Sequence, residues 1–378
     1  MPFHSQILLK FNAYYSIIFS AVLQFFRGLP TIINMKKRKN IKVTWLIALI
    51  TVSSLLFTGC NIPFSKPTQA QSKTGLYFDT VITVTLYGSK EETAPLLKGC
   101  FQLADRFEKR FSNTRSTSEI SRINEAAGKP VSVSSDTVNI LKDAISYGQK
   151  SNGAFDVTIG RLSDAWDFKS NTGHIPSQNT LQQAVKTIDY TNIQISDDTV
   201  SLRNPNTRLD LGGIAKGYIA DSMKTYLKKQ GVTKGIINLG GNVLCIGEKE
   251  KNVPFTVGIQ KPFTEDGTPL FTLKIKDLSV VTSGTYQRYF RKNGKLYHHI
   301  LNTKTGLPVQ NHLTSVTIIS NRSTDGDALS TTAFCMGAKD GLAYIEKLKN
   351  TEAIFVLDSG NILKTSGIGT KIPFTLVK

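Results

Sequence analysis

The sequence is poor in cysteine and in acidic residues, and both shortages exclude classes of protein. Four cysteines occur in 378 residues, at positions 60, 100, 245 and 335, and no two are close enough to form a CxxC pair. Zinc-finger and dithiol redox sites are therefore not expected, and the last three cysteines are predicted to be small buried hydrophobic side chains. The 28 Asp and Glu residues face 46 Lys and Arg, which gives a formal net charge of +18.

Most of this positive charge remains when the N-terminal segment is set aside. Residues 1–59 carry seven Lys or Arg and no acid, so the rest of the chain carries +11. A basic chain favours anionic partners such as phosphorylated ligands or an anionic envelope. The sequence has no helix-turn-helix signature, no zinc-ligand spacing and no clustered arginine stripe, so no nucleic-acid partner is predicted.

The N-terminal segment has the pattern of a secretory signal peptide preceded by additional sequence. Met35 begins a basic cluster, an uncharged and mostly apolar run occupies 43–57, and Cys60 follows a glycine. Such a run is too short to span a bilayer comfortably. We therefore expect 35–59 to be the signal peptide. Residues 1–34 are expected to be an artefact of the assigned translation start, and the alternative is a first membrane helix.

The cysteine at the end of this segment resembles the one in a bacterial lipobox. That resemblance implies cleavage before Cys60 and attachment of a diacylglyceryl group to its sulfur. Residues 60–75 are rich in Ser, Thr, Gln, Pro and Lys without apolar periodicity, which predicts a flexible tether. The folded part, 76–378, is then expected at the extracytoplasmic face of the cell membrane, held there by the lipid.

Strands outnumber helices in the predicted folded part, and most strands follow one another through short turns. Alternating apolar residues predict strands, and apolar residues three or four apart predict helices. Strands are expected at 78–87, 131–133, 154–158, 193–195, 200–202, 235–239, 254–260, 271–275, 278–281, 316–320, 353–357 and 361–364, and helices at 95–110, 214–229, 327–336 and 342–348 and from 118 and 134 onward. This pattern predicts an α+β fold, with antiparallel sheets and packed helices in a single compact unit.

The segment 283–309 gathers several groups that can bind a ring or carry a proton. Asn293–Gly294 supplies the two positive-φ residues of a tight hairpin turn. In the returning strand, alternation places Tyr297 and His299 on one face and His298 on the other. An ordinary amphipathic ribbon with a capped turn is the plainer interpretation.

Two further segments combine charge with glycine or hydroxyl groups. In DLGGIAKG (210–217), two glycines stand where a predicted strand gives way to a helix, and free N–H groups there favour phosphate, with Lys216 adding a charge. Asp327 and Thr331 stand four residues apart on one helix face, and carboxylate and hydroxyl oxygens suit Mg²⁺. A simple tight turn and a helix N-cap are the plainer interpretations. Gly240-Gly241-Asn242 closes another strand and either approaches a ligand or simply turns.

These segments occur together with several others in one order along the chain: FDTVITVTLYG, FSNTRSTSEISRIN, GAFDVTIG, LDLGGIAKGY, INLGGN, SGTYQRYFRKNGKLYHHILNTKTGLPV and GDALSTTAFCMG. In that order they resemble the ApbE family of FAD:protein FMN transferases over nearly the whole folded part. The resemblance implies a T-fold-like α+β domain that binds FAD with Mg²⁺, transfers FMN to a Ser or Thr hydroxyl of an acceptor protein, and releases AMP. The acceptor pattern it implies is Asp or Asn, then Ser/Thr-Gly-Ala-Ser/Thr and a final Thr.

The resemblance also implies roles for individual residues. It assigns the metal to the carboxylate of Asp327, the hydroxyl of Thr331 and the backbone carbonyl of Gly213. His299 matches the histidine suggested as general base. The implied FAD contacts are Phe78, Ala154, Phe155, Asp156, Asp210, Lys216, Leu301 and Ser330.

The chain departs from the family pattern at two places, and two other functions stay open. Thr114 stands where many members have an aromatic residue, and Asn302-Thr303 replaces a common Asp-Pro. The resemblance extends to membrane-anchored members in Gram-positive bacteria, which flavinylate extracellular electron-transfer proteins, and the expected anchor at Cys60 fits that role. The alternatives are an FAD pyrophosphatase, in which water replaces the acceptor hydroxyl, and a lipoprotein that binds FAD without turnover.

Overall fold

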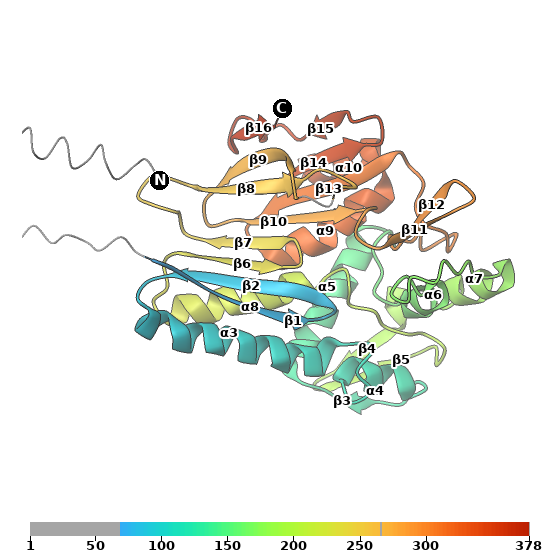
Figure 1. Cartoon of the computed structure of the whole chain (residues 1–378). Helices are drawn as coiled ribbons and strands as arrows, with labels where there is room; N and C mark the ends of the chain where they lie inside the picture. Colours follow the sequence, from blue (N-terminus) through green and yellow to red (C-terminus); the bar gives the residue numbers. More distant parts are fainter. Residues whose placement is uncertain (1–68, 265–266, 378) are drawn as a thin grey trace, which may run out of the picture. The chain divides into compact units, whose positions relative to one another are not determined.

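The computed structural model describes residues 69–264 and 267–377, and their central element is an antiparallel sheet of eight strands (Figure 1). The strands lie in the order β1-β2-β6-β7-β10-β13-β14-β15. Their bounds are β1 Ala70–Tyr77, β2 Thr80–Tyr87, β6 Gly235–Leu239, β7 Asn242–Ile246, β10 Ser279–Gly284, β13 Leu313–Ser320, β14 Thr351–Leu357 and β15 Ile362–Lys364. The predicted α+β class with antiparallel sheets is confirmed.

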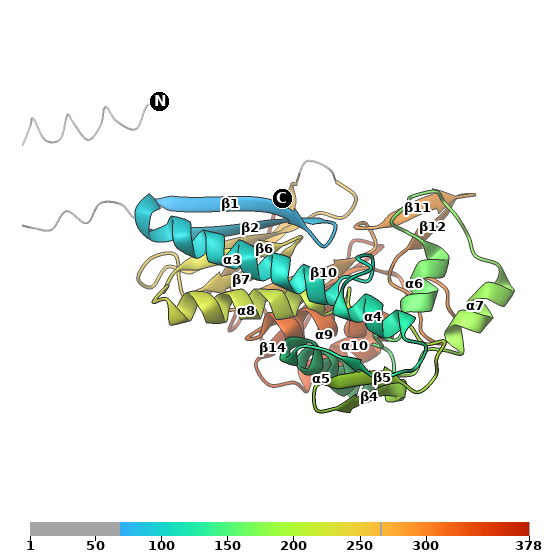
Figure 2. The ribbon, with the colours of Figure 1, turned by 90° about the horizontal axis from the view of Figure 1, so that it is seen from below.

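Helices cover one face of this sheet, as the two perpendicular views show (Figures 1 and 2). Phe107, Met223 and Phe334 from three of them are buried in one core with sheet residues. The helices of this layer are α3 Lys90–Phe111, α8 Ala215–Lys229, α9 Ser323–Met336 and α10 Ala338–Glu346, and α5 Ser135–Lys150 packs against α9 on the side away from the sheet. Apolar side chains at helical spacing explain why these segments form helices and which side they bury.

A small sheet, β16-β9-β8, covers part of the other face of the central sheet. Its strands are β8 Phe255–Gln260, β9 Pro269–Ile275 and β16 Phe374–Leu376. Phe271 and Leu273 pack in one buried cluster with Val280 and Ile319 of the central sheet. Because β13 lies between the two layers, every residue in it is buried, as expected for a strand covered on both faces.

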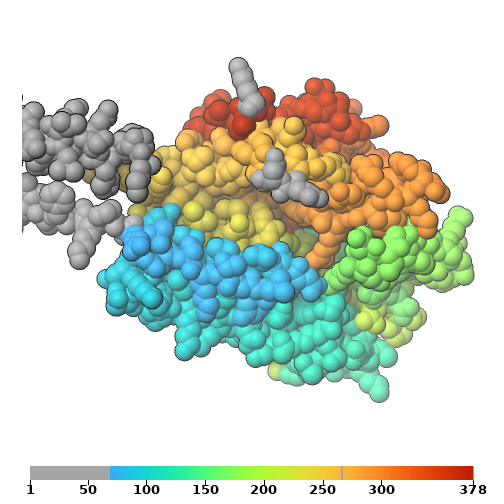
Figure 3. Space-filling view, viewed as in Figure 1, coloured from blue at the N-terminus to red at the C-terminus, as the bar shows by residue number. Residues whose placement is uncertain are grey.

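The remaining elements lie at one end of the central sheet, on the right in Figure 1. They are α4 Glu119–Glu125, β3 Val131–Ser132, α6 Gly160–Trp166, α7 Gln178–Val185, a 3₁₀ turn at Tyr190–Asn192, β4 Ile193–Ser196, β5 Thr199–Leu202, β11 Tyr289–Lys292 and β12 Lys295–His298. Trp166 of α6 packs against Tyr297 of the β11–β12 hairpin, and Phe168, just after α6, packs against Phe290, all in one cluster. The space-filling view shows the orange hairpin next to the green segment that carries α6 and α7 (Figure 3). No helix among the described residues is both long and apolar enough to cross a membrane.

The structure corrects the predicted start of the folded part. β1 begins at Ala70 and pairs with β2 along its whole length, so the tether predicted over 60–75 is wrong from Ala70 onward. Pairs of hydroxyl side chains face each other across these strands, at 2.8 Å for Ser72–Thr85 and 3.0 Å for Thr74–Thr83. A polar edge strand lacks apolar periodicity, which is why the sequence does not reveal it. The predictions for 1–59 and for Cys60 fall outside the described residues.

Other predicted elements differ at their ends or are absent. Residues 154–158 form turns, not the expected strand, and two helices occupy the polar stretch that follows. Asp327 lies in the second turn of its helix, because α9 begins four residues earlier than expected. The interpretation of Asp327 as an N-cap is therefore wrong.

Helix α9 is capped by a neighbouring helix and not by its own N-cap residue. The carboxylate of Asp221, on α8, accepts hydrogen bonds from the backbone N–H groups of Ser323 and Thr324 at 2.8 and 2.9 Å. It also accepts the Thr324 hydroxyl at 2.6 Å. One partly buried carboxylate therefore fixes the start of α9 against α8.

We expect Asp221→Asn to lower the free energy of unfolding by about 1–3 kcal/mol, because an amide nitrogen then faces a helix N–H donor. Urea unfolding of the variant measures this change. Asp340→Asn, an exposed change in the first turn of α10, is the matched control and should unfold as the unaltered protein does. Equal midpoints for both variants would contradict the capping role of Asp221.

Candidate active site

A cavity of about 1110 Å³ lies among the β1–β2 turn, the turn after α5, the Gly212–Lys216 segment, β10, the chain after β12, and α9. All the predicted site residues of the folded part line it except Ser330. Ser330 is fully buried, and its hydroxyl lies 2.8 Å from that of Ser283, which does line the cavity. The fold therefore brings together residues that the sequence spreads over more than 250 positions.

Phe78 reaches this cavity through a turn that the sequence did not predict. Phe78 and Asp79 have φ values of 52° and 56° and form the two-residue turn between β1 and β2. A residue other than glycine in this left-handed backbone conformation raises the energy by about 1–2 kcal/mol. The backbone N–H of Phe78 donates to Oε1 of Glu108 at 2.8 Å, and Asp79 pairs with Lys169 at 2.9 Å. Such strain at a cavity wall is typical of a functional position.

Asp156 shapes the cavity wall through its bonds to the backbone. Its Oδ1 accepts the Thr158 N–H at 2.9 Å and the Thr158 hydroxyl at 2.7 Å, and its Oδ2 accepts the Tyr190 N–H at 2.9 Å. Burial raises the pKa of Asp156, and these hydrogen bonds oppose that rise. Both carboxylate oxygens are thus used to hold the turn that presents Ala154 and Phe155 to the cavity.

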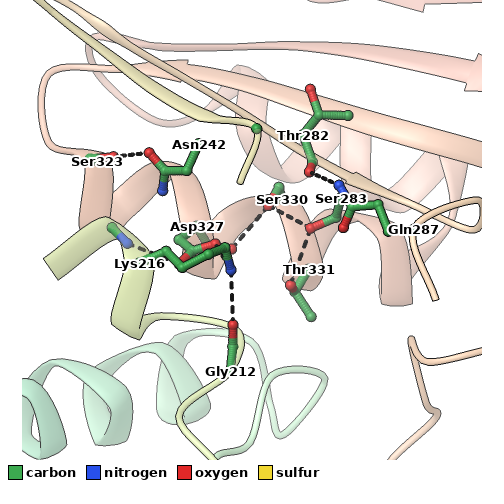
Figure 4. Close-up of polar contacts among 12 residues, drawn as sticks. Gly212, Lys216, Asn242, Thr282, Ser283, Gln287, Ser323, Asp327, Ser330 and Thr331 are labelled. Atoms are coloured by element: carbon green, nitrogen blue, oxygen red, sulfur yellow. Dashed lines mark hydrogen bonds and ion pairs between the residues drawn. The ribbon is translucent and has the colours of Figure 1, made fainter. Parts of the chain in front are cut away.

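Asp327 and Lys216 form the most polar part of the cavity (Figure 4). Asp327 is 4% exposed, and its Oδ2 accepts the Gly217 N–H at 3.0 Å. Its Oδ1 lies 3.3 Å from Nζ of Lys216, which also donates to the Gly212 carbonyl at 3.1 Å. A Cβ on Gly217 would lie 2.3 Å from the Ser323 carbonyl oxygen. Glycine is therefore required for α8 to approach α9 and to donate to Asp327.

Neutral oxygens surround this carboxylate. Thr331 stands one helical turn beyond Asp327, and its hydroxyl lies 3.4 Å from that of Ser283. Gly213 faces the same place, since a Cβ built on it would lie 3.5 Å from Oγ1 of Thr331. The predicted ligands Gly213, Asp327 and Thr331 are thus neighbours, and Ser283 adds a hydroxyl that the sequence did not assign.

This donor set fits a hard divalent cation. Among residues 69–264 and 267–377, no three His, Cys, Asp or Glu side chains gather into a cluster that could hold a metal ion. One carboxylate with hydroxyl and carbonyl oxygens suits Mg²⁺ and does not suit metals that prefer thiolate or imidazole ligands. The Lys216 ammonium group already lies between a carboxylate and a carbonyl oxygen, so these oxygens accommodate a positive charge.

The two adjacent histidines have different surroundings. His298 is 2% exposed, and its Nε2 lies 2.9 Å from the Val309 carbonyl while its Nδ1 accepts the Ile300 N–H at 3.3 Å. His299 lies just beyond the end of β12 and lines the cavity. Its Nδ1 is 3.3 Å from the Arg288 carbonyl. When Nδ1–H donates to this carbonyl, Nε2 is the nitrogen that accepts a proton, so only His299 is arranged as a base.

Both histidines are uncharged at neutral pH. Burial lowers the pKa of His298 to about 4. The pKa of His299 is lowered to about 3, chiefly by burial and also by the neighbouring His298 and Arg288. A neutral imidazole is the form that can take up a proton.

We expect acid to destabilise the protein through His298. In the unfolded chain a histidine binds its proton near pH 6.5, whereas folded His298 stays neutral down to about pH 4. Protons therefore favour the unfolded state below about pH 6.5, and at pH 5 His298 alone lowers the free energy of unfolding by about 2 kcal/mol. Urea unfolding at neutral pH and at pH 5, in the unaltered protein and in His298→Gln, measures this loss. An equal loss in both proteins would contradict it.

Comparison with known proteins defines the relationships of this chain. The sequence model of the ApbE family matches residues 78–355, which contain the whole cavity wall described above. The chain therefore belongs to the ApbE family. This confirms the family that the sequence motifs resemble, and it groups the cavity residues with a family of known fold.

Individual known proteins match most of this chain. A FAD:protein FMN transferase of Klebsiella pneumoniae is 37% identical, with 75% of this chain and 88% of that protein covered. One of Treponema pallidum is 30% identical, with 80% and 88% covered. The crystal structure of the ApbE protein of Thermotoga maritima aligns with a TM-score of 0.74 at 30% identity, with 79% of this chain and 97% of that chain covered. These matches confirm the fold expected from the resemblance.

Proposed function

We propose that this protein transfers FMN from FAD to a Ser or Thr hydroxyl of an acceptor protein in a Mg²⁺-dependent reaction that releases AMP. The observation that carries the proposal is one cavity in which Asp327, Thr331 and Lys216 face a neutral His299. Its volume suits a large ligand such as a dinucleotide. The names of the Klebsiella and Treponema relatives support the same reaction.

The proposed roles follow from where charge and protons have to go. The acceptor oxygen attacks the FMN-side phosphorus of FAD, the bond from that phosphorus to the AMP oxygen breaks, and AMP leaves with that oxygen. Nε2 of His299 takes the proton of the attacking hydroxyl. Lys216 supplies positive charge beside the phosphates, and Mg²⁺ held by Asp327, Thr331 and the Gly213 carbonyl would supply neutralisation of the developing charge.

The low pKa of His299 is compatible with this role. The cavity wall near it carries the positive charges of Arg288 and Lys216, which disfavour protonation when no anion is present. A bound dinucleotide brings negative phosphates, and a nearby opposite charge favours the protonated imidazole. Substrate binding therefore raises the proton affinity of His299 at the stage when it is needed.

We also propose that the enzyme works outside the cytoplasmic membrane, anchored by a lipid on Cys60. The basic cluster, the apolar run and the cysteine after glycine support this placement. The acceptor is then an extracytoplasmic protein that carries a flavinylation sequence. Labelling growing cells with a fatty-acid analogue tests the anchor, which should be lost in Cys60→Ala.

The reaction is tested with the purified protein, FAD, Mg²⁺ and a peptide of the acceptor pattern, and the readout is the mass of the peptide. A peptide that gains one FMN while AMP appears supports the transferase. Free FMN and AMP with an unmodified peptide would identify the pyrophosphatase instead. Intact FAD and intact peptide would leave an FAD-binding protein without turnover.

A further inference from the structure

Asn242 places an unpaired amide nitrogen in the wall of the cavity. It is the first residue of β7, directly after the Gly240–Gly241 turn, and its side chain is 1% exposed. Among residues 69–264 and 267–377, Nδ2 of Asn242 is the only buried side-chain nitrogen or oxygen without a hydrogen-bond partner. Because leaving a buried donor unpaired costs stability, such an atom usually serves a purpose beyond folding.

A short chain of hydroxyl groups fixes the orientation of this amide. The Ser279 hydroxyl donates to the Ser323 hydroxyl at 2.9 Å. Ser323 in turn donates its own proton to Oδ1 of Asn242 at 2.5 Å. Since the oxygen of the amide is held by Ser323, the nitrogen is the end that points away from Ser323 (Figure 4), and Asn242 is one of the residues that line the cavity.

The amide nitrogen lies on the charged side of the cavity. Ser323, which holds Asn242, and Asp327 stand four residues apart and share one face of α9. Asp327 does not serve as the missing acceptor, because Nδ2 of Asn242 makes no hydrogen bond to any described residue, and the Asp327 oxygens interact with the Gly217 N–H and the Lys216 ammonium group. An unpaired N–H donor in the same cavity wall as Lys216 calls for a further anionic oxygen, which a bound ligand would bring.

We infer that Nδ2 of Asn242 donates a hydrogen bond to a phosphate oxygen of the bound substrate. The inference rests on the proposed function for the identity of the substrate, and on the position of Asn242 for the choice of its phosphate part. A neutral donor is suited to this place, since it binds an anionic oxygen without repelling a cation at Asp327. Asn242 is thereby a substrate-binding residue that binds the phosphates together with Lys216.

Asn242→Asp tests this inference with little change of shape. The variant keeps an oxygen for Ser323 and replaces the N–H donor by a carboxylate oxygen that repels phosphate. Calorimetric titrations with ADP, adenosine and riboflavin, with and without Mg²⁺, compare ligands with and without phosphate. We expect the Kd for ADP to rise by about tenfold or more, while those for adenosine and riboflavin change less than about twofold.

Two further variants support the comparison. Asn361→Asp makes the same chemical change in an exposed turn and should leave all three affinities unaltered. Asn242→Ala introduces no charge and replaces the first variant if Asn242→Asp does not fold. It should still weaken ADP selectively, by about threefold or more.

Other outcomes would overturn the inference. Weaker riboflavin binding with unchanged ADP binding would show that the amide binds the flavin and not a phosphate. Equal weakening of all ligands together with a lower melting temperature would make Asn242 a structural residue. If the unaltered protein binds ADP through Asn242 but transfers no FMN, the proposed function fails and the inference stands. If it binds neither ADP nor FAD, both fail.

Discussion

Asp327→Asn is expected to abolish Mg²⁺-dependent FMN transfer, with kcat/KM lower by about 10³-fold or more. Removal of the only carboxylate among the proposed ligands takes away the charge that attracts a divalent cation, and a bound cation contributes several kcal/mol to a phosphoryl-type transition state. The variant should still fold, because an amide oxygen can accept the Gly217 N–H that Asp327 accepts at 3.0 Å. Initial rates over a range of Mg²⁺ concentrations measure the effect.

Asp325→Asn is the matched control for this experiment. Asp325 lies on the same helix, but it accepts the Tyr147 hydroxyl at 2.5 Å and pairs with Arg322 at 3.3 Å, and it does not line the cavity. That variant should lose stability and keep its Mg²⁺ dependence. If Asp327→Asn instead transfers FMN at the unaltered rate and with the same Mg²⁺ requirement, the proposed cation site is wrong.

His299→Ala is expected to lower kcat by about 10²–10⁴-fold while FAD still binds. This is the usual contribution of a positioned general base, and the side chain offers the cavity one free ring nitrogen. FAD affinity should change little, because the phosphates are held by groups on the Lys216 and Asp327 side. Single-turnover rates with saturating FAD, together with a fluorescence titration of FAD, separate the two effects.

The pH profile distinguishes a base from a residue that only shapes the cavity. In the unaltered protein the transfer rate should fall as His299 becomes protonated in acid, and in His299→Ala this part of the profile should disappear. His299→Gln keeps most of the shape and should be as slow as the alanine variant. A fast His299→Gln variant would show that shape, and not proton transfer, is what the reaction needs.

Local patterns in the sequence determined much of the fold. Asn293 and Gly294 have φ values of 51° and 74°, and the strands on either side pair as the hairpin prediction requires. Helix α8 and strand β6 begin and end within a residue of their expected bounds. These elements were predictable because their apolar periodicity and turn residues act over a few neighbours, whatever surrounds them.

The same local reasoning failed where the surroundings decide the structure. Strand β1 is polar and forms because β2 supplies backbone hydrogen bonds. Helix α9 starts at Ser323 because Asp221, about a hundred positions earlier, accepts its first N–H groups. The left-handed turn at Phe78 is stabilised by Glu108, whose carboxylate accepts the Phe78 N–H.

The sequence by itself determined the family, the α+β class and which residues gather at the site, because motifs of charge, glycine and hydroxyl groups are carried by short segments. Only the tertiary structure decided what each group is free to do. It engages both ring nitrogens of His298 and leaves one on His299, commits the Asp156 carboxylate to the backbone, and leaves the Asn242 nitrogen unpaired. The physical reason is that hydrogen-bond partners and burial come from residues far apart in the chain, and these set whether a polar group supports the fold or remains available to a ligand.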